Sequence, residues 1–386
     1  MTYPRSHLVD PDGGVYHVCS RCVRIQIRDT QLLPNSGHPP SSNLPIGSLA
    51  NILIKLQTSL IPLVSCLIHP APMTYPRSHL VDPDGGVYHV CSRCVRRAFL
   101  CGYDQETKTE YEHRRAWLEA RMLKLSDIFA VDLFGYSVMS NHYHMVVQIV
   151  PDRVNSWSDD TVAEKWLMLF PRRAGSQLAE QVKQAAKNEM LTNPERMAEL
   201  RARLSSLSWL MRCLNEPLAR LANQEDCCKG RFWEGRFKSQ RLLDETAVLA
   251  AMVYVDLNPI RAGIATGVED SHHTSIHRRK HTQKGAEPLG SISDSPEPLP
   301  VLCYLDEYEE LLIWTAYAQQ NKRPISAMAQ RTLAQSNAPN STIWLEHYLP
   351  KPNCWQRAIG SIQSLKDYAK DLNQCWIKTR SMHLQS

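Results

Sequence analysis

The sequence has no long apolar run that is free of polar residues and prolines. The best apolar stretch, residues 49–68, contains Lys55, Gln57 and Pro62, whereas a membrane-spanning helix needs about 20 predominantly apolar residues. Residues 1–5 also do not begin a secretory signal, because the apolar segment of such a signal is missing. We therefore expect a cytoplasmic protein that does not interact with a membrane.

A strong excess of charge of one sign is absent as well. The formal net charge is +5 over 386 residues, a mild basic excess that is compatible with a nucleic-acid partner without requiring one. No nucleotide-binding loop is apparent in the chain, so nothing in the sequence indicates an external energy source.

Cysteine is present but not in the pattern of a disulfide scaffold. The twelve cysteines are spread along a large chain without an export signal, so we expect reduced thiols. Cys19/Cys22 and Cys91/Cys94 have the spacing of zinc ligands. Residues three apart on a strand face opposite sides, however, so we expect no structural zinc site.

The first 24 residues recur without a change at residues 73–96. Two copies separated by unrelated residues do not make a solenoid, and a recent duplication at the DNA level fits better. Residues 25–72 contain several prolines and serines and show no periodicity of a packed element. We expect residues 1–72 to be a poorly ordered extension, with Met73 as a plausible natural start.

The rest of the chain predicts an α+β domain followed by helices. We expect a strand over residues 87–95, a helix over 109–129, strands over 131–136 and 138–150, helices over 156–221, a strand over 230–243 and a helix over 245–257. Asp244 is placed to cap the last helix, and Pro259 follows its end. The predicted domains are 73–276, a linker over 277–300 that begins with the basic run His277–His281, and a small helical C-terminal domain over 301–386.

His142 and His144 lie two residues apart in an apolar run. On a strand both project from one face, where two imidazoles can bind one metal ion, and Tyr143 points to the other face. Ser140-Asn141 is a turn-forming pair, so the histidines should open the strand near a sheet edge that solvent reaches. The alternative is a pair of partly buried histidines that are satisfied by ordinary hydrogen bonds.

Tyr254 and Asn258 are four residues apart on a predicted helix, a spacing that places them on one face. Two imidazoles and an amide oxygen would leave open positions on a divalent ion for phosphate oxygens while the tyrosine attacks. A phenol with an ordinary pKa near 10 needs a nearby cation to favour phenolate. The alternative for Tyr254 is a core aromatic residue on an amphipathic helix.

The segment from Lys229 to Arg241 interleaves basic and aromatic residues between glycines. Positive charge and aromatic faces are what single-stranded nucleic acid requires, although a solvated surface ribbon is the simpler alternative. Arg172 and Arg173 offer additional phosphate contacts. The DNA-binding candidates are Arg93, Arg96, Arg97, Arg231, Phe232, Trp233, Arg236, Lys238 and Arg241.

With these residues assembled, the chain resembles the REP-associated tyrosine transposases of the single-tyrosine HUH superfamily. The resemblance covers about residues 73–386, and the matching blocks are residues 92–101, 138–144, 230–243 and 254–263. It implies a ferredoxin-like fold with an antiparallel sheet. Residues 1–72 have no counterpart in the family, and Tyr143 stands where the superfamily prefers an apolar residue.

The resemblance implies roles for four residues. His142 and His144 correspond to the metal-binding pair, Asn258 to the third ligand of Mg²⁺ or Mn²⁺, and Tyr254 to the nucleophile. The implied protein is a nucleoid-associated monomer or homodimer that cuts and rejoins single-stranded DNA at REP hairpins through a 5′-phosphotyrosine. Two alternatives remain: a non-catalytic hairpin-binding protein derived from a transposase, and a phosphodiesterase that uses the two histidines as acid and base without metal.

Overall fold

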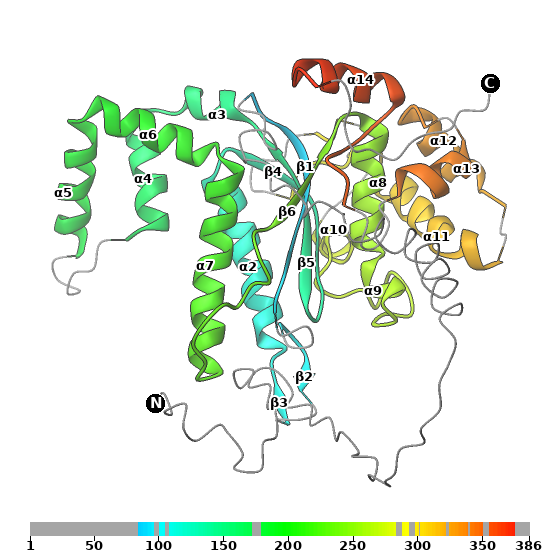
Figure 1. Ribbon diagram of the computed structural model, residues 1–386, viewed down its shortest axis with the longest axis horizontal. Helices are drawn as coiled ribbons and strands as arrows, with labels where there is room; N and C mark the ends of the chain where they lie inside the picture. Colours follow the sequence, from blue (N-terminus) through cyan, green and yellow to red (C-terminus); the bar gives the residue numbers. More distant parts are fainter. Residues whose placement is uncertain are drawn as a thin grey trace, which may run out of the picture. The chain divides into compact units, whose positions relative to one another are not determined.

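A five-stranded sheet lies at the centre of the part of the chain that the structure, a computed structural model, describes (Figure 1). All described residues belong to one compact unit, Arg77–Ser386. They are residues 84–95, 100–104, 108–171, 179–282, 288–292, 298–300, 302–321, 324–338, 340–349 and 355–374.

Several predictions therefore lie outside the described residues. These are the N-terminal extension with the first repeat copy, the apolar stretch over residues 49–68, and the candidate phosphate contacts Arg96, Arg97, Arg172 and Arg173.

The strand order is β4-β5-β1-β6-β7. The first four strands pair antiparallel, whereas β7 pairs parallel to β6 and makes the sheet mixed. The strands are β1 Gly86–Arg93, β4 Val131–Val138, β5 His142–Ile149, β6 Lys238–Leu242 and β7 Ala358–Ile359; a separate small hairpin is formed by β2 Tyr103–Asp104 and β3 Thr109–Glu110.

The four antiparallel strands follow the order of a ferredoxin-like sheet, with the first and third of them at the centre, but five described helices, α3 to α7 over residues 151–225, stand between the third and fourth strands where that fold has one. The α+β fold with flanking helices is confirmed. The strand predicted over residues 230–243 is shorter than expected, because only Lys238–Leu242 joins the sheet. The helix predicted from residue 109 begins at His113.

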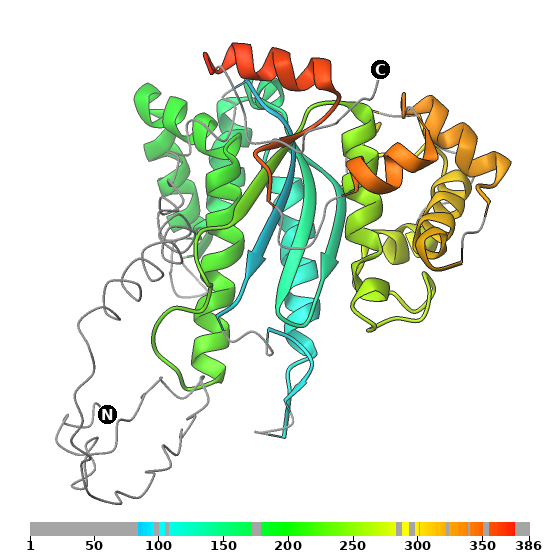
Figure 2. The same cartoon turned by 45° about the vertical axis from the view of Figure 1, so that its right-hand side comes forward.

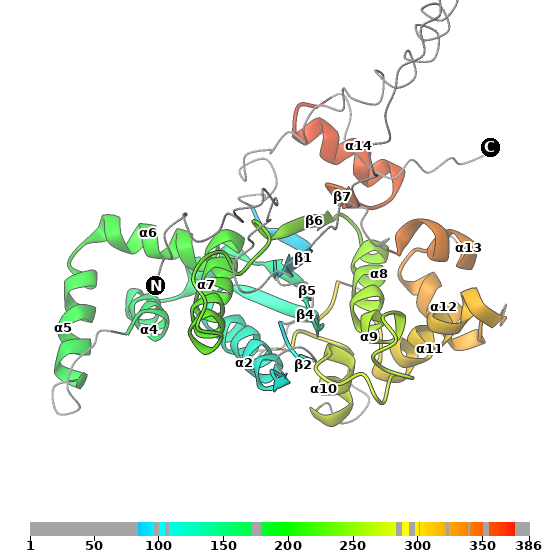
Figure 3. The same ribbon diagram turned by 60° about the horizontal axis from the view of Figure 1, so that its bottom comes forward.

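Helices cover both faces of the sheet, as Figures 1 and 3 show. On one face lie α2 His113–Ile128, α3 Pro151–Ser156, α4 Asp159–Leu169, α5 Ala179–Leu191, α6 Pro194–Leu204 and α7 Leu207–Glu225. On the other lie α8 Glu245–Asp256, α9 Asn258–Arg261, α10 Ser275–Thr282, α11 Leu305–Asn321, α12 Ala327–Gln335, α13 Ser341–Ile343 and the π-helical turn η3 Trp344–Tyr348, and α14 Ile362–Asp371 follows β7. Within the described ranges, no helix combines the length and the apolar character that crossing a membrane requires.

Helix α8 is the element that positions the site described below. Its sequence is apolar on nearly every side, and all but its first residue are buried, as expected for a helix enclosed by other elements. The Asp244 side chain accepts a hydrogen bond from Ala247 N at 2.9 Å, so the predicted cap is confirmed.

The predicted linker begins inside a helix, and the predicted C-terminal helices pack against the sheet and α8. His277–His281 lies in α10, where the buried Arg279 guanidinium donates to the carbonyls of Phe134 and Gly290 at 2.8 Å each. The C-terminal helices share one hydrophobic core with the sheet and α8, since Tyr308 and Trp344 belong to the same cluster as Phe134. Figure 2 shows these helices beside α8. Buried apolar faces on α11 and η3 thus complete this core instead of forming their own.

Asp256, the last residue of α8, is buried and joins three elements. Its carboxylate accepts hydrogen bonds from Ser275 Oγ at 2.6 Å, Ile276 N at 3.0 Å and Tyr308 Oη at 2.8 Å. Asp256→Ala is expected to lower the free energy of unfolding by about 3 kcal/mol, because it leaves these donors unpaired in the core. Tyr308→Phe removes one donor and should cost about 1 kcal/mol. Urea denaturation measures both free energies. If Asp256→Ala lost no more stability than Tyr308→Phe, Asp256 would not join these elements.

Candidate active site

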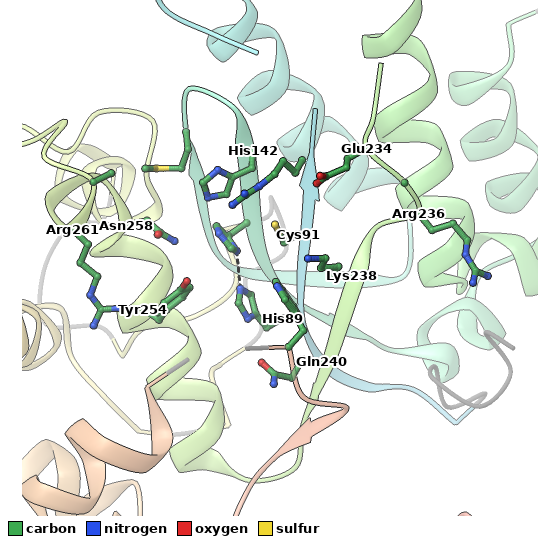
Figure 4. Close-up of a pocket in the computed structure, with 16 residues that line it drawn as sticks. His89, Cys91, His142, Glu234, Arg236, Lys238, Gln240, Tyr254, Asn258 and Arg261 are labelled. Carbon is green, nitrogen blue, oxygen red and sulfur yellow. Dashed lines mark hydrogen bonds between the residues drawn. The ribbon is translucent and has the colours of Figure 1, made fainter. Parts of the chain in front are cut away.

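A pocket of about 480 Å³ lies between one face of the sheet and the α8–α9 segment (Figure 4). The sheet register explains which side chains meet there: Arg93 pairs with His142, and Cys91 pairs with both His144 and Lys238. Paired residues share a face, so three neighbouring strands contribute to one wall. The side chains that line the pocket include His89, Cys91, Arg93, His142, His144, Glu234, Arg236, Lys238, Gln240, Tyr254, Asn258, Arg261 and Trp355.

The two histidines of the His-x-His pair both face this pocket, as their alternation predicted. Their ring centroids lie 4.9 Å apart. Tyr143 points to the opposite face, where its hydroxyl donates to Asn215 Oδ1 on α7 at 2.6 Å. The expected edge position is wrong, because β5 lies between β4 and β1 inside the sheet. The pocket reaches the histidines because they stand at the start of the strand, and His142 is only half-buried.

A third histidine that the sequence interpretation missed contacts the pair. His89 on β1 is buried, and its Nε2 lies 2.9 Å from His144 Nδ1. His144 Nδ1 is therefore occupied by His89, and His144 Nε2 is the nitrogen that can bind a metal ion. His142 is similar, because its Nδ1 is hydrogen-bonded to Asn141 Oδ1. Hydrogen bonds of this kind fix the orientation of a metal-binding imidazole.

Burial keeps these imidazoles neutral. It lowers the pKa of His89 to about 4, and burial with the nearby Arg93 guanidinium lowers the pKa of His142 to about 4. The pKa of His144 falls well below its ordinary value through burial and through its neighbours His89 and His142. Near neutral pH the rings therefore carry lone pairs that can bind a metal ion.

These depressed pKa values predict that acid destabilises the metal-free protein. The unfolded chain takes up a proton near pH 6.5, whereas folded His89 does so only near pH 4. Stability is therefore fully present above about pH 6.5 and falls as the pH drops through this window, by up to about 3 kcal/mol for His89.

His89→Gln removes one titrating ring, so its unfolding free energy should fall less between about pH 7 and about pH 4.5 than that of the unaltered protein. Urea denaturation in EDTA at the two pH values measures this difference. An equal fall in both proteins would contradict the prediction.

Tyr254 on α8 has its ring nearly perpendicular to the His144 ring, at 89°, and inclined at 68° to the His89 ring. Its ring contacts those of His89 and His144 edge-on, each with centroids 5.7 Å apart. Burial raises the pKa of Tyr254, and the Arg261 guanidinium, 5.1 Å from the ring centroid, opposes that rise. The phenol is accordingly protonated near neutral pH, and additional positive charge is needed to produce phenolate.

Asn258 lines the same pocket but belongs to the next helix. Helix α8 ends at Asp256, and Asn258 is the first residue of α9, which corrects the prediction of one shared helix. Leu257 between them has helical dihedral angles, φ −84° and ψ −4°, so the chain continues its turn and Tyr254 and Asn258 still face the same space. The Asn258 Nδ2 atom is buried and has no hydrogen-bond partner among the described residues.

The residues present fit a divalent metal ion with mixed ligands. Two neutral imidazoles face the pocket, and the Asn258 side chain lines it from the opposite wall, as Figure 4 shows. Among the described residues, no group of three or more His, Cys, Asp or Glu side chains is arranged to hold a metal, so an amide oxygen would have to supply the third donor. Burial raises the pKa of the Cys91 thiol to about 12, so this side chain does not offer a thiolate.

The two cysteines of the Cys-x-x-Cys pair lie on opposite faces, as predicted for a strand. Cys91 lines the pocket, whereas Cys94 is fully buried in the core on the α2–α7 side of the sheet.

The predicted DNA-binding residues divide into three groups. Arg93, Arg236 and Lys238 line the pocket and are exposed. Arg231 is exposed on the preceding loop. Arg241 lies on the opposite face of the sheet, where its guanidinium is 5.8 Å from the Tyr88 ring, because residues 238 and 241 cannot share a face of a strand.

The aromatic residues of this segment are not displayed on an exposed ribbon. Phe232, a predicted DNA-binding residue, is 2% exposed in the hydrophobic core, so its ring does not face solvent. Its carbonyl accepts a hydrogen bond from Val95 N at 2.9 Å. Trp233 is half-buried, and its indole N–H donates to the carbonyl of Asn215 at 2.9 Å.

One wall of the pocket comes from the C-terminal region of the chain. Trp355 stacks on His89 with ring centroids 5.0 Å apart and lies parallel to His144 at 6.4 Å. It precedes β7, which pairs with the edge of β6. The C-terminal region therefore contributes directly to the site.

No protein-family model matches this sequence, and no curated protein matches it. Among solved structures, the chain is similar to a REP-associated tyrosine transposase bound to a REP hairpin, at 13% sequence identity and a TM-score of 0.32. The likeness covers 54% of this chain and 87% of that one.

Proposed function

We propose that this protein is an endonuclease and strand transferase that cuts single-stranded DNA at REP-type hairpins and becomes linked to it through a 5′-phosphotyrosine on Tyr254, with Mg²⁺ or Mn²⁺. The observation that supports the proposal is that Tyr254, His142, His144 and Asn258 line one pocket. These are a potential nucleophile and three potential metal ligands, contributed by segments about a hundred residues apart.

The charge around the pocket suits a phosphodiester. Four cationic side chains, Arg93, Arg236, Lys238 and Arg261, line it together with a single carboxylate, Glu234. Clustered positive charge attracts the DNA backbone and stabilises the negative charge that develops on a phosphate under attack.

His142 Nε2, His144 Nε2 and the Asn258 amide oxygen would hold the metal ion. When bound, the ion polarises the scissile phosphate and favours phenolate. The Tyr254 oxygen forms a bond to phosphorus, and the bond from phosphorus to the 3′-oxygen breaks. The phenolic proton passes to solvent and the departing 3′-oxygen takes up a proton, so the 5′ end remains on the protein. A later 3′-hydroxyl reverses this exchange, because the phosphotyrosyl ester retains the reactivity of the original bond.

Two residues position Tyr254 for this attack. Burial raises the pKa of the Tyr254 phenol, and the Arg261 guanidinium over the ring opposes that rise, which favours phenolate relative to a site without this charge. The edge-on contact with His144 holds the ring against the proposed metal site.

A covalent protein–DNA band tests the proposed function. A REP-like hairpin with a single-stranded flank, labelled at its 3′ end, is incubated with the protein and Mn²⁺ and then denatured. We expect a labelled band at the size of the protein that is absent when EDTA replaces Mn²⁺. Hairpin retention without cleavage would instead support the non-catalytic DNA-binding protein, and cleavage in EDTA without a covalent band would support the metal-free phosphodiesterase.

A further inference from the structure

A second hollow, also of about 480 Å³, lies between helix α7 and the loop over residues 230–237. It is separate from the histidines and Tyr254 but shares Gly235 and Arg236 with the active-site pocket. Figure 4 shows the Arg236 side chain directed away from the histidine cluster. The side chains that matter to its chemistry are Trp209, Arg212, Glu216, Trp233, Arg236 and Phe237.

The aromatic side chains of this hollow are half-buried and held in place. Trp233 is fixed by its hydrogen bond to Asn215 O and by an edge contact with Tyr143, with centroids 5.7 Å apart. Trp209 is packed against the guanidinium groups of Arg203, at 4.3 Å, and Arg212, at 4.9 Å, from its ring centroid. Aromatic faces that are already rigid lose little entropy when a planar ligand stacks on them.

The charge of the hollow is positive. Its one carboxylate, Glu216, accepts a hydrogen bond from Arg212 at 3.2 Å and is also paired with Arg220. The Arg236 side chain is exposed. Aromatic faces beside cationic groups are the surface that single-stranded nucleic acid binds, with bases on the rings and phosphates near the guanidinium groups.

The two hollows lie on either side of one loop and share two of its residues, Gly235 and Arg236. Gly235 lines both, and the space where a side chain would project from it is open, with no atom within 4 Å. The backbone at Gly235 therefore leaves room for a strand to cross the loop from one hollow to the other.

We propose that the hollow between α7 and the 230–237 loop binds one unpaired nucleotide of single-stranded DNA, next to the segment held in the active-site pocket. The base stacks against Trp209, with Trp233 and Phe237 beside it, and the adjoining phosphate lies at Arg236. The inference rests on the proposed function and deepens it, because it requires an unpaired nucleotide beside the scissile phosphate.

Fluorescence anisotropy with a labelled hairpin that carries a single-stranded flank tests this site without metal or cleavage. Trp209→Ala is expected to weaken DNA binding about tenfold, the usual effect of losing one stacked base. Trp117→Ala on α2 is the matched control, since Trp117 is 38% exposed and lines neither hollow. It should bind within about twofold of the unaltered protein.

Two additional measurements separate stacking from a folding defect. Trp209→Phe keeps an aromatic face and should restore affinity to within about threefold. An abasic nucleotide moved along the flank should weaken binding by the unaltered protein at one position, and Trp209→Ala should be insensitive at that position, because the same contact is already lost.

Equal affinity of Trp209→Ala and the unaltered protein would overturn the inference and leave the hollow to a partner other than DNA. The inference would also be overturned if each abasic position weakened DNA binding by Trp209→Ala as much as it weakened binding by the unaltered protein. The two proposals fail separately: a covalent band with unaltered DNA binding by Trp209→Ala refutes only the nucleotide site, whereas Trp209-dependent binding without any covalent band refutes only the proposed cleavage.

Discussion

Tyr254→Phe is expected to form no covalent DNA adduct and to cleave at least about 1000-fold more slowly than the unaltered protein. The substitution removes the oxygen that would attack phosphorus and keeps the ring that packs against His89 and His144. Hairpin binding should change less than about twofold, because the cationic residues around the pocket remain. A cleavage assay beside a gel-shift measures the two properties separately.

Tyr143→Phe is the matched control for that change. It deletes the same hydroxyl on the opposite face of the sheet, where the group bonds to Asn215 Oδ1. We expect this variant to lose about 1 kcal/mol of stability and to keep its cleavage. An adduct formed by Tyr254→Phe would refute the assignment of the nucleophile.

His142→Ala is expected to bind Mn²⁺ at least about tenfold more weakly and to cleave at least about 100-fold more slowly. His142 is the better choice of the two histidines, because it is half-buried, whereas His144 is 3% exposed and bonded to His89. Its removal should therefore disturb the fold less. Isothermal titration of Mn²⁺ without DNA gives the metal affinity independently of cleavage.

His281→Ala serves as the histidine control. His281 is exposed on α10, and its Nδ1 is bonded to the carbonyl of His277, outside the pocket. Metal affinity and cleavage should both be unchanged. If His142→Ala bound Mn²⁺ like this control and EDTA did not affect cleavage, metal-dependent chemistry would be excluded.

Local patterns in the sequence predicted the parts of the site that depend on one element. Alternation on β5 correctly assigned His142 and His144 to one face and Tyr143 to the other. The Asp244 cap correctly marked the start of α8. The four-residue spacing correctly predicted that Tyr254 and Asn258 face the same pocket. This holds although α8 ends between them, because Leu257 retains helical dihedral angles.

Contacts between elements were not predictable in the same way. His89 meets His144 because of the register between β1 and β5, and a shift of one residue would turn His89 to the other face. Trp355 reaches the pocket from a segment more than two hundred residues beyond the histidine pair. Alternation in the sequence shows which side chains share a face of a strand, but it does not show which strand or loop packs beside that face.

Two predictions made from local composition differ from the structure, because in both segments a buried residue has polar or charged neighbours in the sequence. The basic run in α10 has the composition of a linker, yet its Arg279 is buried and bonds to two carbonyl groups. Phe232 follows Arg231 in a basic segment, yet its ring lies in the core. In both cases the partners come from distant strands or loops, which local sequence does not reveal.

The central claim is that Tyr254 becomes joined to the 5′ end of cleaved DNA. Its most direct test is peptide mass spectrometry of the protein after reaction with the hairpin in Mn²⁺ and nuclease trimming. The account predicts a nucleotide adduct on the peptide that contains Tyr254, attached through its side-chain oxygen. An adduct on a different residue, or efficient cleavage with Tyr254 unmodified throughout, would contradict it.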